Sequence, residues 1–236
     1  MWKLFDTGVK TAKENMLLDA QLLENLDPKG DSVLHLYEWD GLSATYGYFI
    51  NTSQFLNLEA VQKTSLSLAR RPTGGGIVFH VSDLAFSVLV PSGHEGFSEN
   101  TLDNYHFVNK KVALAIKGVM QEASLELLPQ DPKSVDSSSS HFCMAKPTIF
   151  DVMVDGKKVA GAAQRKRKQG FLHQGSISIA FPEDSFLKEI LLPDTKVLES
   201  MKANTYTMLK SPWSLKDLGE IRQILRKHLK RVFLEG

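Results

Sequence analysis

Three glycine-containing segments hold the residues that are best suited to chemistry. They are RRPTGGGIVFH at 70–80, the hairpin segment DGKKVAG at 155–161, and GFLHQGS at 170–176. Adjacent glycines allow backbone N–H groups to approach an anion or a carbonyl closely. Arg70 and Arg71 would add positive charge beside such a group. If one sheet brings the three segments together, they form a pocket that offers backbone donors and a lysine.

The three adjacent glycines do not by themselves identify a ligand. Glycine costs chain entropy, so a triple needs a reason, but a flexible hairpin turn would be a sufficient one. No G-K-[ST] follows the glycines and their spacing is not G-x-G-x-x-G, so neither common phosphate-binding loop is indicated. The role of this loop has to be decided from other parts of the chain.

Cys143 is the only cysteine of the chain, and two interpretations of it are open. It could be a nucleophile, since a thiolate beside cations is reactive. It could equally be a buried, inert side chain. A single cysteine excludes an internal disulfide and a cysteine-based zinc site. The seven histidines show no spacing typical of metal ligands.

These segments have to be positioned by the elements of an α+β fold. Apolar periodicity and capping patterns predict helices over 12–26, 59–68, 101–123, 184–190 and 196–209, and a packing helix after the Ser214–Asp217 capping box. Apolar and alternating runs predict strands at 33–38, 44–50, 84–90, 149–154 and 176–181, with a hairpin turn at Asp155-Gly156. Residues 131–142 are the most loop-like stretch. The mixture favours mixed, mostly antiparallel sheets flanked by helices.

Length and composition limit the class of protein. The chain has 236 residues, 42% of them hydrophobic, and a net charge of +1, which suits one large domain with an ample core. This charge gives no reason to expect a nucleic-acid or membrane partner. No apolar run is long enough to span a membrane, and the N-terminus lacks the apolar segment of a secretory signal. We expect a cytoplasmic enzyme.

Several spaced motifs, in order, resemble the lipoate–protein ligase A and octanoyltransferase family, within the superfamily that includes biotin–protein ligases. The matching segments are NMLLD at 15–19, YGYFIN at 46–51, RRPTGGGIVFH at 70–80, DLAFSVLV at 83–90, VDGKKVAGAAQ at 154–164 and LHQGSI at 172–177. The resemblance implies a catalytic domain of the biotin/lipoate-protein-ligase type over residues 1–210. Residues 211–236 would then be a C-terminal helix packed on it, with no full accessory domain.

The resemblance also implies a site. Lys158 matches the family lysine that polarises the acyl carbonyl or acyl phosphate, and the glycine loop would wrap the activated acyl group. The residues that the resemblance assigns to acyl or adenylate binding are Gly47, Asn51, Arg70, Arg71, Thr73, Gly74, Gly75, Gly76, Val78, His80, Gly161, Ala163, His173 and Gly175.

Two mechanisms share this scaffold. A lipoate ligase uses ATP and Mg²⁺ to form lipoyl-adenylate, whereas an octanoyltransferase passes octanoyl from acyl carrier protein through a cysteine thioester. Some relatives move octanoyl or lipoyl between lipoyl domains by the same thioester route. Cys143, which lies 15 residues before Lys158, resembles the cysteine of one transferase branch, although Met144 follows it where that branch has Phe. GGGIVFH and Asp151 resemble the ligases, in which this aspartate would help to hold the adenylate with a metal. Phe150 replaces the paired asparagine, and Asp83 comes two positions later than the ligase pattern. We predict the ligase by a narrow margin.

Either mechanism places lipoate or octanoate on a lysine of a lipoyl-domain protein. The acceptors implied are the E2 subunits of 2-oxoacid dehydrogenases or the H protein of glycine cleavage, with acyl carrier protein or a separate accessory chain as further partners. The basic run from Arg165 to Lys168 is interpreted as a solvated turn, with docking of an acidic partner as the alternative. A third hypothesis is a non-catalytic scaffold that binds an acyl group or a lipoyl domain.

Overall fold

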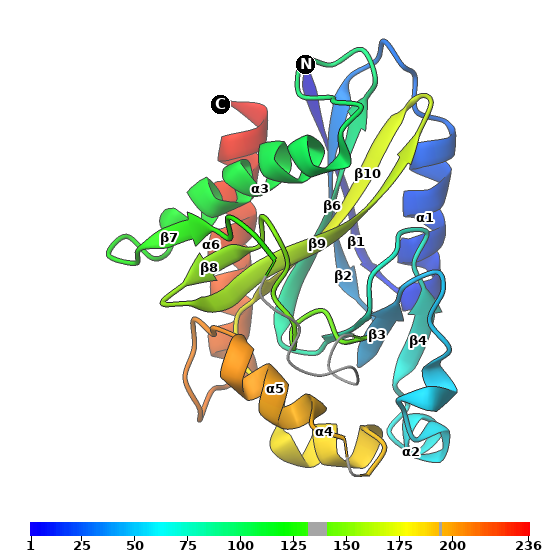
Figure 1. Cartoon of the computed structure of the whole chain (residues 1–236), viewed down its shortest axis with the longest axis vertical. Helices are drawn as coiled ribbons and strands as arrows, with labels where there is room; N and C mark the ends of the chain where they lie inside the picture. The colour runs from blue at the N-terminus through cyan, green and yellow to red at the C-terminus, as the bar shows by residue number, and fades with distance from the viewer. Residues whose placement is uncertain (132–140, 194) are drawn as a thin grey trace.

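The computed structural model describes residues 1–131, 141–193 and 195–236, and its framework is a seven-stranded sheet (Figure 1). In spatial order the strands are β1 (Trp2–Lys10), β2 (Ser32–Trp39), β6 (Asp83–Pro91), β10 (Gly170–Ser178), β9 (Lys157–Arg167), β8 (Val152–Val154) and β7 (Leu125–Leu127). Only β1 and β2 pair in parallel in this sheet, and its other described pairs are antiparallel. The predicted α+β class with mostly antiparallel sheets is confirmed.

A smaller sheet holds both ends of the glycine loop. Its order is β4 (Ser67–Arg70), β3 (Ser43–Tyr46) and β5 (Ile77–His80), with β3 in the centre. β4 pairs in parallel with β3, and β5 pairs with it antiparallel. Residues 71–76 therefore connect two strands that are both anchored on β3, which fixes where the loop begins and ends.

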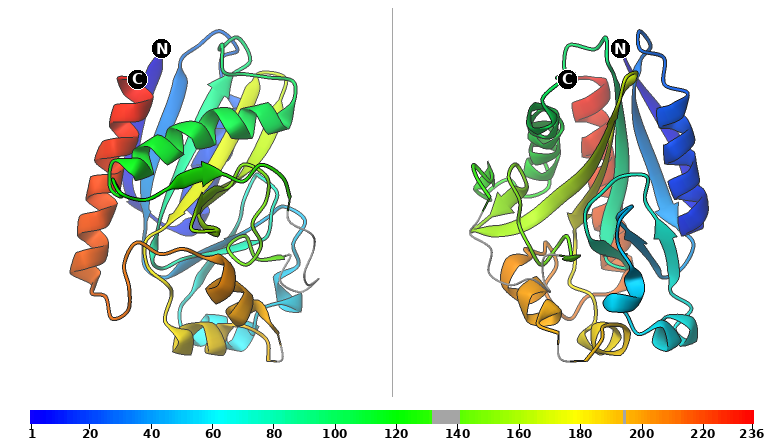
Figure 2. Two further views of the ribbon diagram at one scale, coloured as in Figure 1. Left: turned by 60° about the vertical axis from the view of Figure 1, so that its left-hand side comes forward. Right: turned by 45° about the vertical axis from the view of Figure 1, so that its right-hand side comes forward.

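The helices are α1 (Ala12–Glu24), α2 (Leu58–Lys63), α3 (Thr101–Lys117), α4 (Asp184–Ile190), α5 (Val197–Asn204) and α6 (Leu215–Leu234), with the 3-10 helix η1 (Thr52–Gln54). Residues of α2, α4 and α5 form a core cluster with the small sheet, whereas α1, α3 and α6 cover the two faces of the large one. Figure 2 shows α1 on one face of the sheet and α3 with α6 on the other. Strand alternation follows this division: Phe86 and Val88 belong to the core with α3 and α6, whereas Leu89 packs with Leu23 of α1.

The C-terminal helix is a packing helix, as predicted. Both halves of the Ser214–Asp217 capping box are formed at its start. Its apolar stripe is buried in the main core through Leu218, Leu225, Leu229 and Phe233. No helix in the described ranges is long and apolar enough to cross a membrane.

Several predicted elements differ from the observed ones. The helix predicted over 59–68 ends at Lys63, because Ser65 takes a positive φ of 55° and the chain then enters β4. The strand predicted over 44–50 ends at Tyr46, where Gly47 turns toward the glycine loop. The helix predicted over 196–209 covers only α5. β1 was not predicted, since its pairing with β2 depends on a distant segment rather than on its own pattern.

Candidate active site

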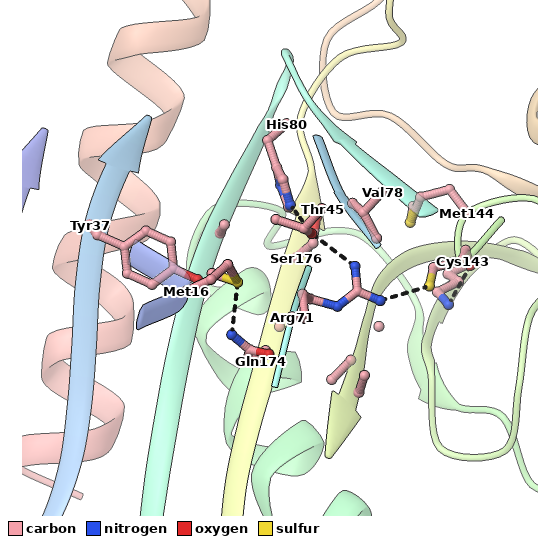
Figure 3. A pocket seen from close by; sticks show the side chains of 16 residues that line it. Met16, Tyr37, Thr45, Arg71, Val78, His80, Cys143, Met144, Gln174 and Ser176 are labelled. Atoms are coloured by element: carbon pink, nitrogen blue, oxygen red, sulfur yellow. Dashed lines mark hydrogen bonds between the residues drawn. The ribbon is translucent and has the colours of Figure 1, made fainter. Parts of the chain in front are cut away.

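The predicted segments meet around Cys143, beside the glycine loop (Figure 3). The Cys143 backbone N–H donates to the Ile77 carbonyl at 3.1 Å, which docks this residue against β5. The partly exposed Cys143 Sγ accepts a hydrogen bond from the Gly76 N–H at 3.2 Å and lies 3.9 Å from Arg71 Nη2. Hydrogen-bond donors and a cation beside sulfur stabilise a thiolate, so the arrangement suits a nucleophile.

Arg71 is a buried cation without a carboxylate partner among the described residues. Its Nη2 donates to the carbonyls of Gly74 and Gly76 at 3.0 and 2.7 Å, and its Nη1 donates to Thr45 Oγ1 at 2.8 Å. A buried charge is costly unless an opposite charge compensates it. A thiolate at Cys143, or an oxyanion formed on an acyl group there, would supply that opposite charge.

Lys158 is also buried, next to the backbone of the cysteine. Its Nζ donates to the Cys143 carbonyl at 2.7 Å and forms an ion pair with Asp151 Oδ2 at 2.8 Å. The same oxygen of Asp151 accepts hydrogen bonds from the Thr148 N–H and hydroxyl at 2.7 and 3.1 Å. Burial raises the pKa of Asp151, and the neighbouring Lys158 ammonium opposes that rise. The lysine, the cysteine backbone and the aspartate therefore form one connected group.

A β-bulge directs Lys158 toward the site. Val152 pairs with Ala160 but Met153 pairs with Lys158, so β9 contains one extra residue at this point. In a regular strand Lys158 would face away from Gly161 and Ala163, because side chains alternate. The bulge reverses the alternation, and Lys158 lines the same pocket as those two residues.

Gly161 leaves the space that Lys158 occupies. A Cβ built at this position would lie 2.2 Å from Lys158 Cε and 2.6 Å from Asp151 Oδ1. These distances are too short for any side chain, so glycine is required for the ion pair to form where it does. The glycine of the motif around Lys158 is thus explained by steric exclusion, because Lys158 occupies the space that a Cβ at Gly161 would need.

The adjacent glycines of the loop have different roles. Gly75 has a φ of +82°, and a Cβ there would lie 3.4 Å from Cys143 Sγ. A Cβ on Gly76 would lie 2.1 Å from the His141 carbonyl oxygen, and one on Gly47 would lie 1.9 Å from the Gly75 oxygen. Gly74 has open space around it. Gly47 and Gly76 therefore let backbone pack against backbone, while Gly75 is the glycine that faces the sulfur.

The pocket is a narrow cavity of about 30 Å³ between the two sheets. Figure 3 shows Cys143 and Met144 on one side of it and Met16 and Tyr37 on the other. A second cavity of about 30 Å³ shares Val78, Met144 and Ser176 with it. A larger hollow of about 320 Å³ borders the glycine loop and shares Cys143, Lys158 and Ala163 with the narrow cavity. An acyl chain that enters the narrow cavity requires the side chains along it to move, and the flexible methionines are suited to this.

The structure places most of the predicted binding residues in or beside this pocket. Those that line it are Arg71, Val78, His80, Cys143, Lys158, Gly161, Ala163 and Gly175. The residues that support the loop are Gly47, Thr73, Gly74, Gly75 and Gly76, through the contacts of the loop with β3 and β10.

Three predicted binding residues lie elsewhere. Asn51 caps η1, where its side chain accepts from the Ser53 N–H. Arg70 is exposed, and its guanidinium stacks over the Tyr48 ring at 4.7 Å. His173 points to the α3 face of the sheet, where it contacts Tyr105, because it neighbours the pocket-facing Gln174 in an alternating strand. Burial lowers the pKa of His173 to about 3, so this ring stays neutral.

Asp151 is paired with Lys158 in this structure, and its metal role stays a prediction. Its carboxylate is already in contact with the Lys158 ammonium, which would repel a divalent cation at the same oxygen. The described residues contain no group of three histidine, cysteine, aspartate or glutamate side chains that could hold a metal ion. What the contacts of Asp151 show is that its carboxylate positions the Lys158 ammonium.

Thr45 and Gln174 are among the pocket residues that were not predicted. Gln174 donates to Asp19 Oδ2 at 2.6 Å and accepts from Thr73 Oγ1 at 2.7 Å, so it connects the glycine loop to α1. Asp19 is fully buried and also accepts from Ser87 Oγ at 2.6 Å. A sequence signal existed for Asp19, since it shares one helical face with Met16 and Leu23. A carboxylate on the apolar face of a helix will be buried, and a buried charge needs hydrogen-bonding partners, so such partners are predicted for Asp19.

Comparisons with known proteins agree on one family. The family profile described as lipoyl protein ligase A/B catalytic domain matches residues 11–230. Octanoyltransferase LipM of Bacillus subtilis (strain 168) is 31% identical over 206 residues, which cover 86% of this chain and 74% of that protein. Octanoyltransferase LipM of Halalkalibacterium halodurans is 27% identical over 241 residues, which cover 100% and 86%.

A solved structure shows the same fold at lower sequence identity. The bipartite lipoate protein ligase of Thermoplasma acidophilum, described with its E2 lipoyl domain, superposes with a TM-score of 0.67 at 20% identity. The match covers 98% of this chain and 82% of that one. At this identity the likeness establishes the fold and leaves the reaction to be argued from the site.

Proposed function

The chain belongs to the family of lipoyl protein ligase A/B catalytic domains, and from this premise we propose that it transfers octanoyl to a lysine of a lipoyl-domain protein through a thioester on Cys143. The main support is the environment of the sulfur. Cys143 Sγ lies in the pocket, accepts the Gly76 N–H and stands beside the buried, uncompensated Arg71. An inert cysteine would need none of these contacts.

The ligase mechanism favoured by the sequence is not confirmed. One of its two supports was Asp151 as a metal-binding residue, and that carboxylate is paired with Lys158 instead. The relatives described above are named octanoyltransferases. We therefore prefer the transferase, which was the alternative, and derive no step through ATP or Mg²⁺.

The proposed chemistry has two acyl-transfer steps. The Cys143 thiolate attacks the thioester carbonyl of the donor, a new S–C bond forms, and the donor thiol leaves with the proton that Cys143 gave up. The ε-amine of the acceptor lysine then attacks the enzyme thioester, the amide forms, and a proton from the amine returns to the Cys143 sulfur. Each step passes through an oxyanion, which the Lys158 ammonium and the Arg71 guanidinium would stabilise.

We propose two protein partners for these steps. The donor is an octanoyl thioester on acyl carrier protein, because the nucleophile is a thiol and the exchange of one thioester for another needs no activation. The acceptor is a lipoyl domain, as in the archaeal system whose ligase has the same fold. The E2 subunits of 2-oxoacid dehydrogenases and the glycine cleavage H protein contain such domains and are both candidates.

The test uses purified protein, an apo lipoyl domain and two alternative donors. Octanoyl-acyl carrier protein is supplied in one reaction, and free octanoate or lipoate with ATP and Mg²⁺ in the other, with intact mass as the readout. We expect acceptor modification from the thioester donor only, a mass increase on the enzyme when the acceptor is omitted, and loss of both in Cys143→Ser. Modification from the free acid and ATP that survives Cys143→Ser would instead establish the ligase. No modification from either donor would favour the non-catalytic scaffold.

A further inference from the structure

A line of buried hydrogen bonds leads away from the sulfur behind Arg71 (Figure 3). Arg71 Nη1 lies 2.8 Å from Thr45 Oγ1, and Thr45 Oγ1 lies 2.8 Å from His80 Nε2. His80 Nδ1 in turn lies 2.8 Å from Asp83 Oδ2. All four side chains are at most 6% exposed, so solvent does not compete for these contacts.

The direction of each hydrogen bond follows from the chemistry of the groups. Arginine can only donate, so Thr45 Oγ1 accepts from Arg71. The Asp83 carboxylate can only accept, so His80 Nδ1 carries the proton that is donated to it. In the neutral imidazole that the proposal requires, Nε2 is then unprotonated and accepts the Thr45 hydroxyl proton. Asp83 thus selects the tautomer of His80 that allows Thr45 to hold Arg71.

Two further contacts fix the end of this line. The His80 ring stacks on Trp39 with centroids 4.3 Å apart and an interplanar angle of 21°. Asp83 Oδ2 also accepts from Ser176 Oγ at 2.6 Å. The imidazole therefore has little freedom to rotate. The carboxylate reaches His80 although it comes later in the sequence than the family pattern implies, because the chain turns between β5 and β6.

We propose that Thr45, His80 and Asp83 are positioning residues that hold the Arg71 guanidinium beside Cys143 and so increase the reactivity of the thiol. The proposal rests on the proposed role of Cys143 as a nucleophile. It gives His80 a task other than the acyl binding that its motif implied, since both ring nitrogens are engaged within the protein.

The first test compares Thr45→Val with Thr45→Ser. Valine has nearly the shape of threonine but no hydroxyl, whereas serine keeps the hydroxyl. Because Cys143 is the only cysteine, its alkylation by iodoacetamide at pH 7 can be followed by intact mass without any acyl substrate. We expect alkylation to be roughly tenfold slower in Thr45→Val, the size expected from losing one charge-assisted hydrogen bond, and close to wild type in Thr45→Ser. Thr64→Val is the matched control, because it removes a hydroxyl that donates to the Ala60 carbonyl at the C-terminal cap of α2.

The second test needs no variant and covers the case in which Thr45→Val does not fold. Ring ¹⁵N shifts of His80 in the wild-type protein report its tautomer, and we expect protonated Nδ1 and unprotonated Nε2. Equal alkylation of Thr45→Val and wild type, or a proton on Nε2, would overturn the proposal. Thioester formation by the wild type is measured in parallel. If no thioester forms but the alkylation order and the tautomer are as expected, the proposed function fails while the positioning role stands.

Discussion

At the scale of single residues, the site depends on its glycines as much as on its reactive side chains. Gly161 provides the volume that Lys158 fills, and Gly75 keeps the approach to Cys143 Sγ free of a Cβ. The Lys158 ammonium lies where it can stabilise the oxyanion of an acyl group bound to the Cys143 sulfur, since it already donates to the Cys143 carbonyl. Its position is decided by Asp151 and by the bulge in β9.

Lys158→Ala is expected to abolish acyl transfer. The variant removes the cation that would stabilise the oxyanion and leaves Asp151 buried without a partner. Octanoylation of an apo lipoyl domain, followed by intact mass, should fall by about 10²-fold or more. Lys157→Ala is the matched control, because Lys157 is exposed and its Nζ donates to the Lys202 carbonyl at 3.4 Å, with no carboxylate partner among the described residues. Near-normal turnover of Lys158→Ala would contradict the assignment.

At the scale of elements, β9 joins the site to a basic surface. Its first half contains Lys158 and Gly161, and its last residues begin the basic run that was predicted to be a turn. That prediction is wrong for Arg165 to Arg167, which continue the strand because they pair with β10. Arg165 donates to the Pro72 carbonyl at 2.8 Å, which places this surface next to the glycine loop.

The basic run is expected to contribute to partner docking. Lys166 is paired with Glu99 at 2.6 Å, but Arg167 and Lys168 are exposed. If an acidic carrier or lipoyl domain docks here, Arg167→Glu with Lys168→Glu should raise KM for that partner several-fold while kcat stays nearly constant. The salt dependence of KM should become weaker as well.

A double variant with the same charge change serves as the control for this docking experiment. Lys188→Glu with Lys227→Glu alters exposed lysines of α4 and α6, away from the glycine loop. We expect its KM and salt dependence to match wild type. If both double variants raise KM equally, the effect comes from net charge, and local docking at the end of β9 is refuted.

At the scale of the whole molecule, the site lies where the two sheets meet and depends on helices that hold the sheets in place. α6 covers the face of the large sheet opposite the pocket and packs against α3. Arg226 of α6 binds both carboxylate oxygens of Asp6 in β1 at 2.8 Å. This ion pair connects the last helix of the chain to the first strand.

The stability contributed by this ion pair should depend on pH. Burial works to raise the pKa of Asp6, but the Arg226 guanidinium outweighs it and holds the pKa below the usual 3.8. A lowered folded-state pKa stabilises the protein above the unfolded value, and the contribution is lost as the pH falls through the folded value. Arg226→Met should therefore lower Tm by about 2–4 °C at pH 7. The difference from wild type should shrink as the pH falls below 3.8.

Thermal unfolding of both proteins between pH 7 and pH 3 checks this prediction. Lys227→Met is the control, because Lys227 is the exposed neighbour of Arg226 on the same helix. Its Tm difference from wild type should be small and independent of pH. A constant Tm deficit of Arg226→Met down to pH 3 would show that the arginine acts through packing of its aliphatic part instead.

The sequence by itself determined the family, the α+β class, the approximate positions of the helices and of strands β2, β3, β6 and β8, and the identities of Cys143, Lys158 and the glycine loop. These follow from local patterns: capping residues, apolar periodicity, the hairpin at Asp155-Gly156, and motifs whose residues are close together in the chain. Local patterns predicted a strand at 176–181 and left His173 outside it, whereas β10 is Gly170–Ser178 and the ring of His173 faces away from the pocket.

Only the tertiary structure decided which side chains share the pocket. Strand period alone would place Lys158 opposite Gly161, and the bulge at Val159 reverses this because β8 pairs with β9 out of regular register. The pairing of the Asp151 carboxylate with Lys158 was likewise not visible in the sequence. No sequence pattern gave a reason to select Thr45, whose hydroxyl contacts both Arg71 and His80 in the folded chain. Contacts between residues distant in the chain depend on register and packing, and the sequence pattern of a single segment contains neither.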